Sequence, residues 1–257
     1  QDPSLALRVV RLANSAAYGQ SREVNSLQRA FAVIGLGQLS AVLAGIASVD
    51  RCERFVNDPD FDWGAFWGHC SGTAFIASSL AGRLGLRFQG AEFLGGLLHD
   101  VGYLALAKFD PARFRAAMRF SIEKHGFLSQ AVESVFGVGT PEAGEMLAEA
   151  SSLAPEVRLV IRHHRAPEAV PAGSRALVGT VSLANALAHL AGMTFGRGTA
   201  DVEVVVRDLP AWRLLEGMKP AMAEWDVARL VFELEREYVA SQGFVTEVRP
   251  TGSGKNP

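Results

Sequence analysis

Proline placed directly after a capping residue recurs along this chain and fixes where several helices begin. Asp2-Pro3, Asp110-Pro111 and Thr140-Pro141 each combine a side-chain oxygen suited to an N-cap with a proline suited to the first helical turn. Apolar residues follow at helical spacing, whereas a strand-like run is found only at 202–206, where a charged residue interrupts it. The sequence therefore predicts an all-α fold.

The remaining helices are expected from the spacing of apolar residues and from the breaks between them. The expected ranges are about 3–18, 26–34, 39–49, 60–84, 91–108, 155–164, 174–190 and 220–240. The large aromatic residues near the C-terminus, Trp212, Trp225 and Phe232, are expected in the core rather than on a docking surface. We expect an N-terminal helical lobe at 1–57, a larger helical bundle at 58–245 and a disordered, polar tail at 246–257.

Composition excludes several functional classes. The formal net charge is −2 at pH 7, so the chain as a whole offers no attraction for the phosphates of nucleic acid. Two cysteines, Cys52 and Cys70, are too few for a disulfide framework, which favours a reducing, cytoplasmic location. The longest uncharged stretch, 30–49, is interrupted by glycine and polar residues, so no membrane segment is predicted.

Histidines occur where the pattern otherwise predicts buried helix. His69, His99, His163 and His164 all lie at or within apolar helices, and Asp100 follows His99 directly. Neutral imidazoles and a carboxylate are ligands that a divalent transition metal prefers. Buried histidines bonded to backbone carbonyls are also common, so a purely structural role stays open. The two other histidines, His125 and His189, are expected at a helix end and on a helix surface, respectively.

Several segments together resemble the HDOD family, the output-domain branch of the HD superfamily. The segments from Asp2 to Leu5, from Leu12 to Ala16 and from Ala30 to Leu36 are similar to its DP-x-L, LxNSA and A-x-x-x-(I/L)-G-L elements. Trp67 to Cys70, Gly96 to Gly102 and His163 to Pro167 are similar to W-x-H-S, GLLHD(I/V)G and HHxxP. The resemblance implies a helical bundle of the HD type in a bacterial signalling protein.

The resemblance also implies a ligand set and shows where this chain departs from it. In catalytic HD enzymes the corresponding pattern binds metal, which maps onto His69, His99, Asp100 and, at the closing position, Asn185. An amide oxygen lacks the negative charge that offsets a divalent ion, so metal affinity should fall. Thr140 also stands where resembling proteins often have histidine. The family usually begins with another helix, so we expect an upstream receiver or sensor domain.

Two functions follow from this pattern. The first is a non-catalytic output module that relays a sensor state to a partner protein. The alternative is a metal-dependent phosphohydrolase acting on a nucleotide, a cyclic dinucleotide or another phosphoester, with His163 or His164 as an additional ligand. In that case Arg162 and Arg165 would bind phosphate oxygens, although two arginines at a helix end also occur without any ligand. We favour the non-catalytic module, with a divalent transition metal as a possible cofactor.

Overall fold

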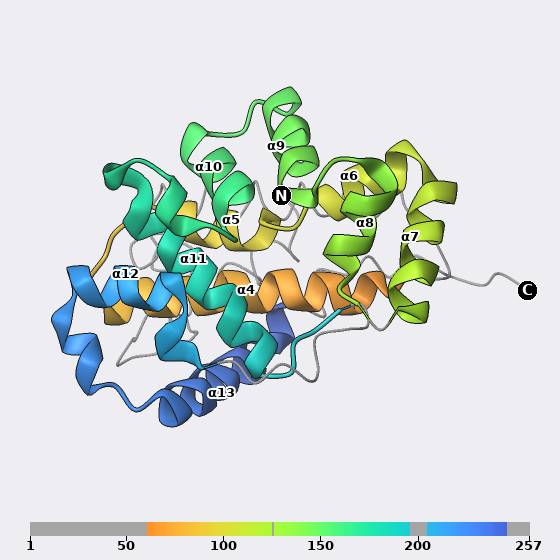
Figure 1. The fold of residues 1–257 in the computed structure, drawn as a ribbon. Helices are drawn as coiled ribbons and strands as arrows, with labels where there is room; N and C mark the ends of the chain where they lie inside the picture. The colour runs from red at the N-terminus through yellow and green to blue at the C-terminus, as the bar shows by residue number, and fades with distance from the viewer. Residues whose placement is uncertain (1–60, 125, 196–204, 246–257) are drawn as a thin grey trace, which may run out of the picture.

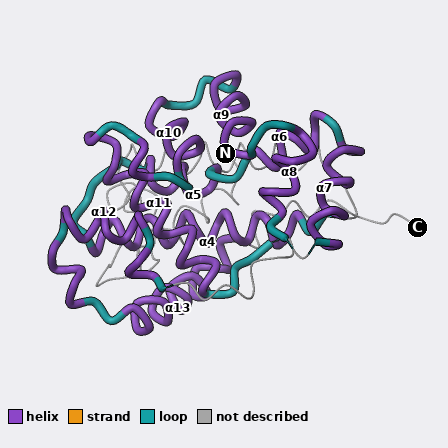
Figure 2. The backbone as a smooth tube through the Cα atoms, viewed as in Figure 1, coloured by secondary structure: helices purple, strands orange, loops and turns teal. Residues whose placement is uncertain are grey.

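The computed structural model describes residues 61–124, 126–195 and 205–245, and within these ranges every regular element is helical (Figures 1 and 2). The all-α prediction is confirmed for this part of the chain. The α-helices are α4 (Trp63–Arg83), α5 (Ala91–Leu98), α6 (Gly102–Phe109), α7 (Pro111–Glu123), α8 (Leu128–Phe136), α9 (Thr140–Ala150), α10 (Pro155–His163), α11 (Ala172–Leu190), α12 (Pro210–Met218) and α13 (Val227–Val245). The expected helices before residue 60, the capping pair Asp2-Pro3, Cys52, His125 and the tail lie outside the described residues.

Helix α4 runs through the middle of the molecule and is buried over most of its length (Figure 1). It begins where the sequence predicts, because the Asp62 carboxylate accepts a hydrogen bond of 2.8 Å from the Ala65 N–H. Its apolar residues contribute to two core clusters. Phe66 and Cys70 belong to the first, with α5 to α9, whereas Ile76 and Leu80 belong to the second, with α11 to α13.

The helix expected at 91–108 is broken into α5 and α6 by a turn at His99–Val101, which corrects the prediction. Both His99 (φ −54°, ψ −36°) and Val101 (φ −57°, ψ −15°) keep right-handed helical angles, so the apolar spacing passes through the turn unchanged. The turn lets α6 pack closely on α9, where a Cβ at Gly102 would overlap the carbonyl oxygen of Thr140. This packing comes from a distant segment and leaves no local sequence signal.

Two other predicted helix starts have different outcomes. Asp110 caps α7 as expected, because its carboxylate accepts from the Arg113 N–H at 3.0 Å. At α9, however, Gly139 is the capping residue and Thr140 is the first helical residue. The Thr140 hydroxyl is buried and has no hydrogen-bond partner among the described residues, so its predicted capping role is wrong.

The C-terminal helices also differ from the prediction in one place. Pro220–Glu224 forms a 3₁₀ helix, and α13 starts only at Val227, after Asp226 accepts from the Arg229 N–H at 3.0 Å. Trp212 is fully buried, whereas Phe232 is 59% exposed and does not belong to the core. Of the strand candidate at 202–206, only the last two residues are described, and Val206 begins a 3₁₀ turn.

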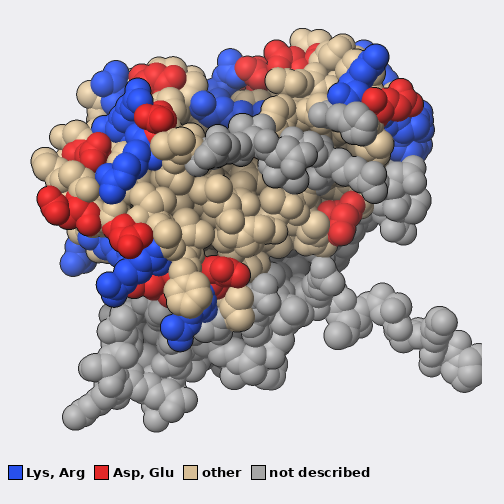
Figure 3. Space-filling view, turned by 60° about the horizontal axis from the view of Figure 1, so that its bottom comes forward, with Lys and Arg blue, Asp and Glu red and all other residues tan. Residues whose placement is uncertain are grey.

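Charged side chains of both signs are interspersed around the face shown in Figure 3, and an uncharged stretch occupies its centre. This face therefore carries no extended field of one sign, in agreement with the small net charge. None of the described helices is long and apolar enough to cross a lipid bilayer.

Candidate functional site

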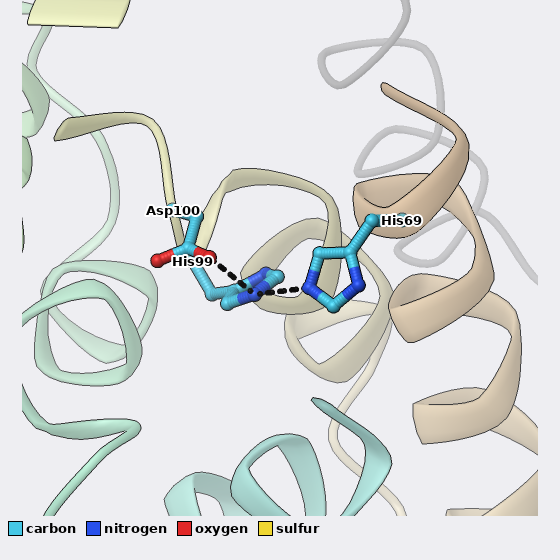
Figure 4. Close-up of side chains that lie close together, drawn as sticks. All are labelled: His69, His99 and Asp100. Atoms are coloured by element: carbon cyan, nitrogen blue, oxygen red, sulfur yellow. Dashed lines mark hydrogen bonds and ion pairs between the residues drawn. The ribbon is translucent and has the colours of Figure 1, made fainter. Parts of the chain in front are cut away.

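His69, His99 and Asp100 come together in the middle of the bundle (Figure 4). His69 lies on α4, and the other two lie on the turn between α5 and α6. The Nε2 atoms of His69 and His99 are 3.2 Å apart, and His99 Nε2 is 3.3 Å from Asp100 Oδ2. All three side chains are buried. The three residues that the HD pattern makes ligands are thus within reach of one ion.

The backbone determines which nitrogen of each imidazole faces the cluster. His69 Nδ1 is 2.8 Å from the Met193 carbonyl, His99 Nδ1 is 2.7 Å from the Gly96 carbonyl, and His164 Nδ1 is 3.1 Å from the Ile161 carbonyl. A carbonyl only accepts, so each Nδ1 carries the proton and donates it. The three Nε2 atoms therefore face into the site, as in metal centres that fix the ring orientation through an outer hydrogen bond.

Burial favours the neutral imidazole at two of these positions. It lowers the pKa of His69 to about 3 and that of His164 to about 4, with contributions from the neighbouring His99. The Nε2 atoms of His69 and His99 face each other across the 3.2 Å contact. That arrangement suits a cation placed between the rings.

Asp100 is the charged member of the cluster. Burial alone would raise the pKa of its carboxyl, but His99 and Arg165 hold that pKa well below its usual range, so Asp100 is ionised. Arg165 Nη2 donates to Asp100 Oδ1 at 3.1 Å, and Arg165 Nε donates to His164 Nε2 at 3.3 Å. The Arg165 guanidinium therefore balances the negative charge of Asp100 and uses the Nε2 atom of His164 as an acceptor.

The other predicted site residues are distributed differently. Arg162 faces α9, where it forms ion pairs with Glu142 and with Glu145, the latter at 3.2 Å. His163 ends α10 and is half-buried, outside the group of His69, His99 and Asp100. His164 lies 3.5 Å from Asp100 Oδ1 through its Nε2 atom. The structure therefore brings His164 and Arg165, but not Arg162 or His163, to the cluster.

Helix α11 brings Asn185 and one unexpected histidine to the site. The ring of His189 lies 4.4 Å from that of His69, centroid to centroid, so its predicted place on a helix surface is wrong. Burial lowers the pKa of His189. Asn185 Oδ1 and His189 Nδ1 are both buried and have no hydrogen-bond partner among the described residues. The spacing of four residues between them, which places both on one helix face, was the available signal.

A cavity of about 450 Å³ opens beside the cluster. Its wall is mostly apolar, and its polar groups are concentrated near Asp100 and on α11. Asp100 is the only acidic residue among the described residues that line it. The lining residues are Asp100, Tyr103, Phe127, Leu128, Ser129, His164, Arg165, Pro167, Ser182, Asn185, Ala186, His189, Leu190, Phe195, Leu209, Pro210 and Ala211.

The donor set fits a single divalent transition ion, but weakly. His69 and His99 offer oriented Nε2 lone pairs, and Asp100 offers one carboxylate oxygen, which together supply three ligands. Asn185 contributes only a neutral oxygen to the neighbouring cavity. The one negative charge is shared with Arg165, so little charge is left to compensate the ion.

The arrangement of a histidine on one helix, a His-Asp turn on the next and a His-His-Arg helix end matches a known family. A model of the HDOD domain matches residues 1–167 of the chain. The chain belongs to the HDOD family. An uncharacterised protein from Treponema pallidum (strain Nichols) is 26% identical over 188 residues, which are 72% of this chain and 36% of the relative. The HDOD chain thus spans little more than a third of that relative's length.

Solved structures show the same fold. An HDOD domain protein of unknown function from Geobacter sulfurreducens is 29% identical, with a TM-score of 0.76 over 97% of this chain and 84% of the other. A Shewanella amazonensis SB2B protein provisionally named a phosphohydrolase gives 0.65 at 22% identity, covering 96% and 84%. A Marinobacter aquaeolei VT8 protein provisionally named a signal transduction protein gives 0.66 at 23% identity, covering 96% and 53%. The HDOD helical bundle is thereby confirmed.

Proposed function

We propose that this HDOD domain is a non-catalytic output module, which relays the state of an upstream sensor to a protein partner in the cytoplasm. The observation that carries the proposal is the ion pair between Asp100 and Arg165, with its 3.1 Å contact. Asp100 is the single acid of the described cavity wall, and its charge is already neutralised inside the protein. The provisional name of the Marinobacter structure agrees with a signalling role.

The electrostatics argue against a tightly held catalytic ion. A divalent ion bound to His69, His99 and Asp100 would lie next to the Arg165 guanidinium, which contacts the same carboxylate. In a buried site, where charges interact more strongly than in water, that proximity is repulsive. Two histidines and one carboxylate can form a hydrolytic metal site, so the weakness here comes from Arg165, which shares the carboxylate with the ion.

A metal-dependent phosphohydrolase is the second candidate, and one observation favours it. The backbone carbonyls that fix the tautomers of His69, His99 and His164 orient their Nε2 atoms as a metal would require. An ion held by His69, His99 and Asp100 would supply a polarised phosphoryl oxygen and an activated water. Arg165, at the cavity wall, would contact the phosphoryl group. The provisional name of one Shewanella structure agrees with this candidate.

Metal content and hydrolysis separate the two candidates. The purified protein is assayed by elemental analysis, and then with Mn²⁺ or Ni²⁺ on bis-p-nitrophenyl phosphate, nucleoside triphosphates and cyclic dinucleotides. We expect substoichiometric metal and no turnover. Metal-dependent hydrolysis that disappears in His99→Ala would refute the output-module proposal.

A charge substitution tests why the site binds metal weakly. Asn185→Asp places a carboxylate at the closing position of the HD pattern and should increase the affinity for Ni²⁺ by tenfold or more, on the order of one charge-assisted contact. Ser182→Asp adds the same charge to the same cavity wall one turn earlier and serves as the control. Equal gains in both variants would mean that general charge, and not the ligand position, limits binding.

A further inference from the structure

The cavity beside the cluster has a charge pattern that the proposed output role does not explain. Its single acid, Asp100, is paired with Arg165, and the other polar side chains of the described wall are imidazoles, hydroxyls and one amide. The two charges cancel within the wall, yet 38% of the Arg165 side chain remains exposed. Its Nη2 atom donates to Asp100, its Nε atom donates to His164, and Tyr103 is a further partner, so a molecule in the cavity meets the part of the side chain that these contacts leave exposed.

Two helix starts add partial positive charge to the same wall. Leu128 and Ser129 form the first residues of α8, and Pro210 and Ala211 form the first residues of α12. Neither start is capped by a side chain, so the N–H groups of Leu128 and Ser129 in α8 have no acceptor of that kind, nor does that of Ala211 in α12, where Pro210 has no N–H. Together with the guanidinium group, these ends favour a negatively charged group in the cavity.

The rest of the cavity wall indicates the polarity and size of a molecule that would fit. Phe127, Leu128, Phe195 and Leu209 make much of the lining apolar. On the α11 side, Asn185 Oδ1 and His189 Nδ1 are buried and lack partners among the described residues. A buried acceptor without a donor costs free energy, and a donor group on a ligand would remove that cost. The volume of about 450 Å³ lies in the range of small-molecule sites.

We propose that this cavity binds a small organic acid, with its carboxylate on Arg165, an apolar body against Phe127 and Phe195, and a hydroxyl group donating to Asn185. The inference rests on the proposed function, since it makes the cavity the place where a non-hydrolysed ligand sets the state of the output module. A cationic ligand is disfavoured because the described wall offers no unpaired acid.

Three matched probes test the ligand chemistry in wild-type protein. They are 3-(4-hydroxyphenyl)propionate, its primary amide and 3-phenylpropionate, each titrated while the protein is observed by NMR. The hydroxylated acid should bind about tenfold more tightly than its amide, the difference expected for one charge-assisted contact. The hydroxylated acid should also bind at least about threefold more tightly than 3-phenylpropionate, which lacks the hydroxyl group. Equal binding of acid and amide, or no spectral change at about 10 mM, overturns the proposal.

Two variants and a control locate the binding. Ala186→Leu fills the cavity from α11 and should weaken binding of the acid by about tenfold or more. Ala172→Leu, at the exposed start of the same helix, should leave it unchanged. Arg165→Gln should reduce the preference for acid over amide to less than about threefold. Unchanged affinity in Ala186→Leu would place the ligand elsewhere.

These probes contain no phosphoester, so their binding does not depend on catalysis. If hydrolysis is observed and the acids also bind, the output role fails while the ligand assignment stands. If neither is observed, the output role stands and the ligand assignment fails.

Discussion

Replacement of Arg165 by glutamine should reveal the energetic role of the ion pair at the centre of the site. Arg165 donates to Asp100 Oδ1 at 3.1 Å, and the side chain of Asp100 is only 5% exposed. Removing the guanidinium would leave a buried carboxylate whose other close neighbours are the imidazoles of His99 and His164. The variant therefore tests the loss of the one arginine that compensates Asp100.

The magnitude follows from the burial of the two partners. Breaking a fully buried ion pair from one side costs about 3 to 5 kcal/mol. Because 38% of the Arg165 side chain is exposed, water screens part of the interaction, and we expect a loss of about 2 kcal/mol in the free energy of unfolding. Arg162→Gln is the matched control, since its acidic partners Glu142 and Glu145 are 40% and 37% exposed, against 5% for Asp100, and these ion pairs should contribute less than about 1 kcal/mol.

The stability that the ion pair contributes should depend on pH in a defined direction. The folded-state pKa of Asp100 lies well below its usual value, so the ion pair contributes fully above the unfolded-state pKa of about 4 and is lost as the pH falls through the folded-state pKa. The stability difference between wild type and Arg165→Gln should therefore be largest near neutral pH. It should narrow below a pH of about 4.

Urea denaturation followed by circular dichroism, in EDTA and at a series of pH values, measures this difference. The reasoning is refuted if Arg165→Gln and Arg162→Gln lose equal stability at pH 7. It is also refuted if the gap between wild type and Arg165→Gln does not change on acidification.

Other parts of the fold give sharper packing tests. Gly102→Ala should cost about 2 kcal/mol or more because its Cβ would overlap the Thr140 carbonyl, whereas Gly82→Ala, with open space at its Cβ, should be neutral or stabilising in thermal melts. Trp212→Ala should cost about 3 to 5 kcal/mol and the exposed Phe232→Ala less than about 1 kcal/mol, and similar losses would contradict the assigned core. Burial raises the pKa of the Cys70 thiol, so in a Cys52→Ser background it should react with a thiol reagent only after unfolding; rapid labelling of folded protein would contradict its burial.

The parts of the fold that could be predicted are those with local causes. Asp62 and Asp110 cap α4 and α7 because their carboxylates reach N–H groups three residues later, a relation that is readable in the sequence. The turn at 99–101 could not be predicted, since it serves the close approach of Gly102 to Thr140 on a helix about 40 residues away.

The residues of the site also divide into those that the sequence could predict and those that depend on distant packing. The occurrence of His69, His99 and Asp100 in otherwise apolar helices made them candidates, the resemblance to HD sequences named them as ligands, and the three do meet in the structure. The opposite orientations of Arg162 and Arg165 could not be foreseen from adjacent positions, because they depend on where α9 and the α5–α6 turn lie. His189 was misplaced although it follows Asn185 by four residues and so lies on the same helix face, because the sequence does not show that α4 covers this face.

Helix α4 carries a mechanical implication for signalling. Helix α4 is 21 residues long, carries His69 in its first half and packs against α13 with its second half. The Tyr238 hydroxyl of α13 also donates to the Gly68 carbonyl, next to His69, at 3.1 Å. A tilt of this helix caused by a change around His69 must move the support on which α13 rests, since tightly packed interiors do not absorb displacement by compressing. Under the proposed output role, the outward face of α13, with the exposed Phe232, is where such a displacement would reach another molecule.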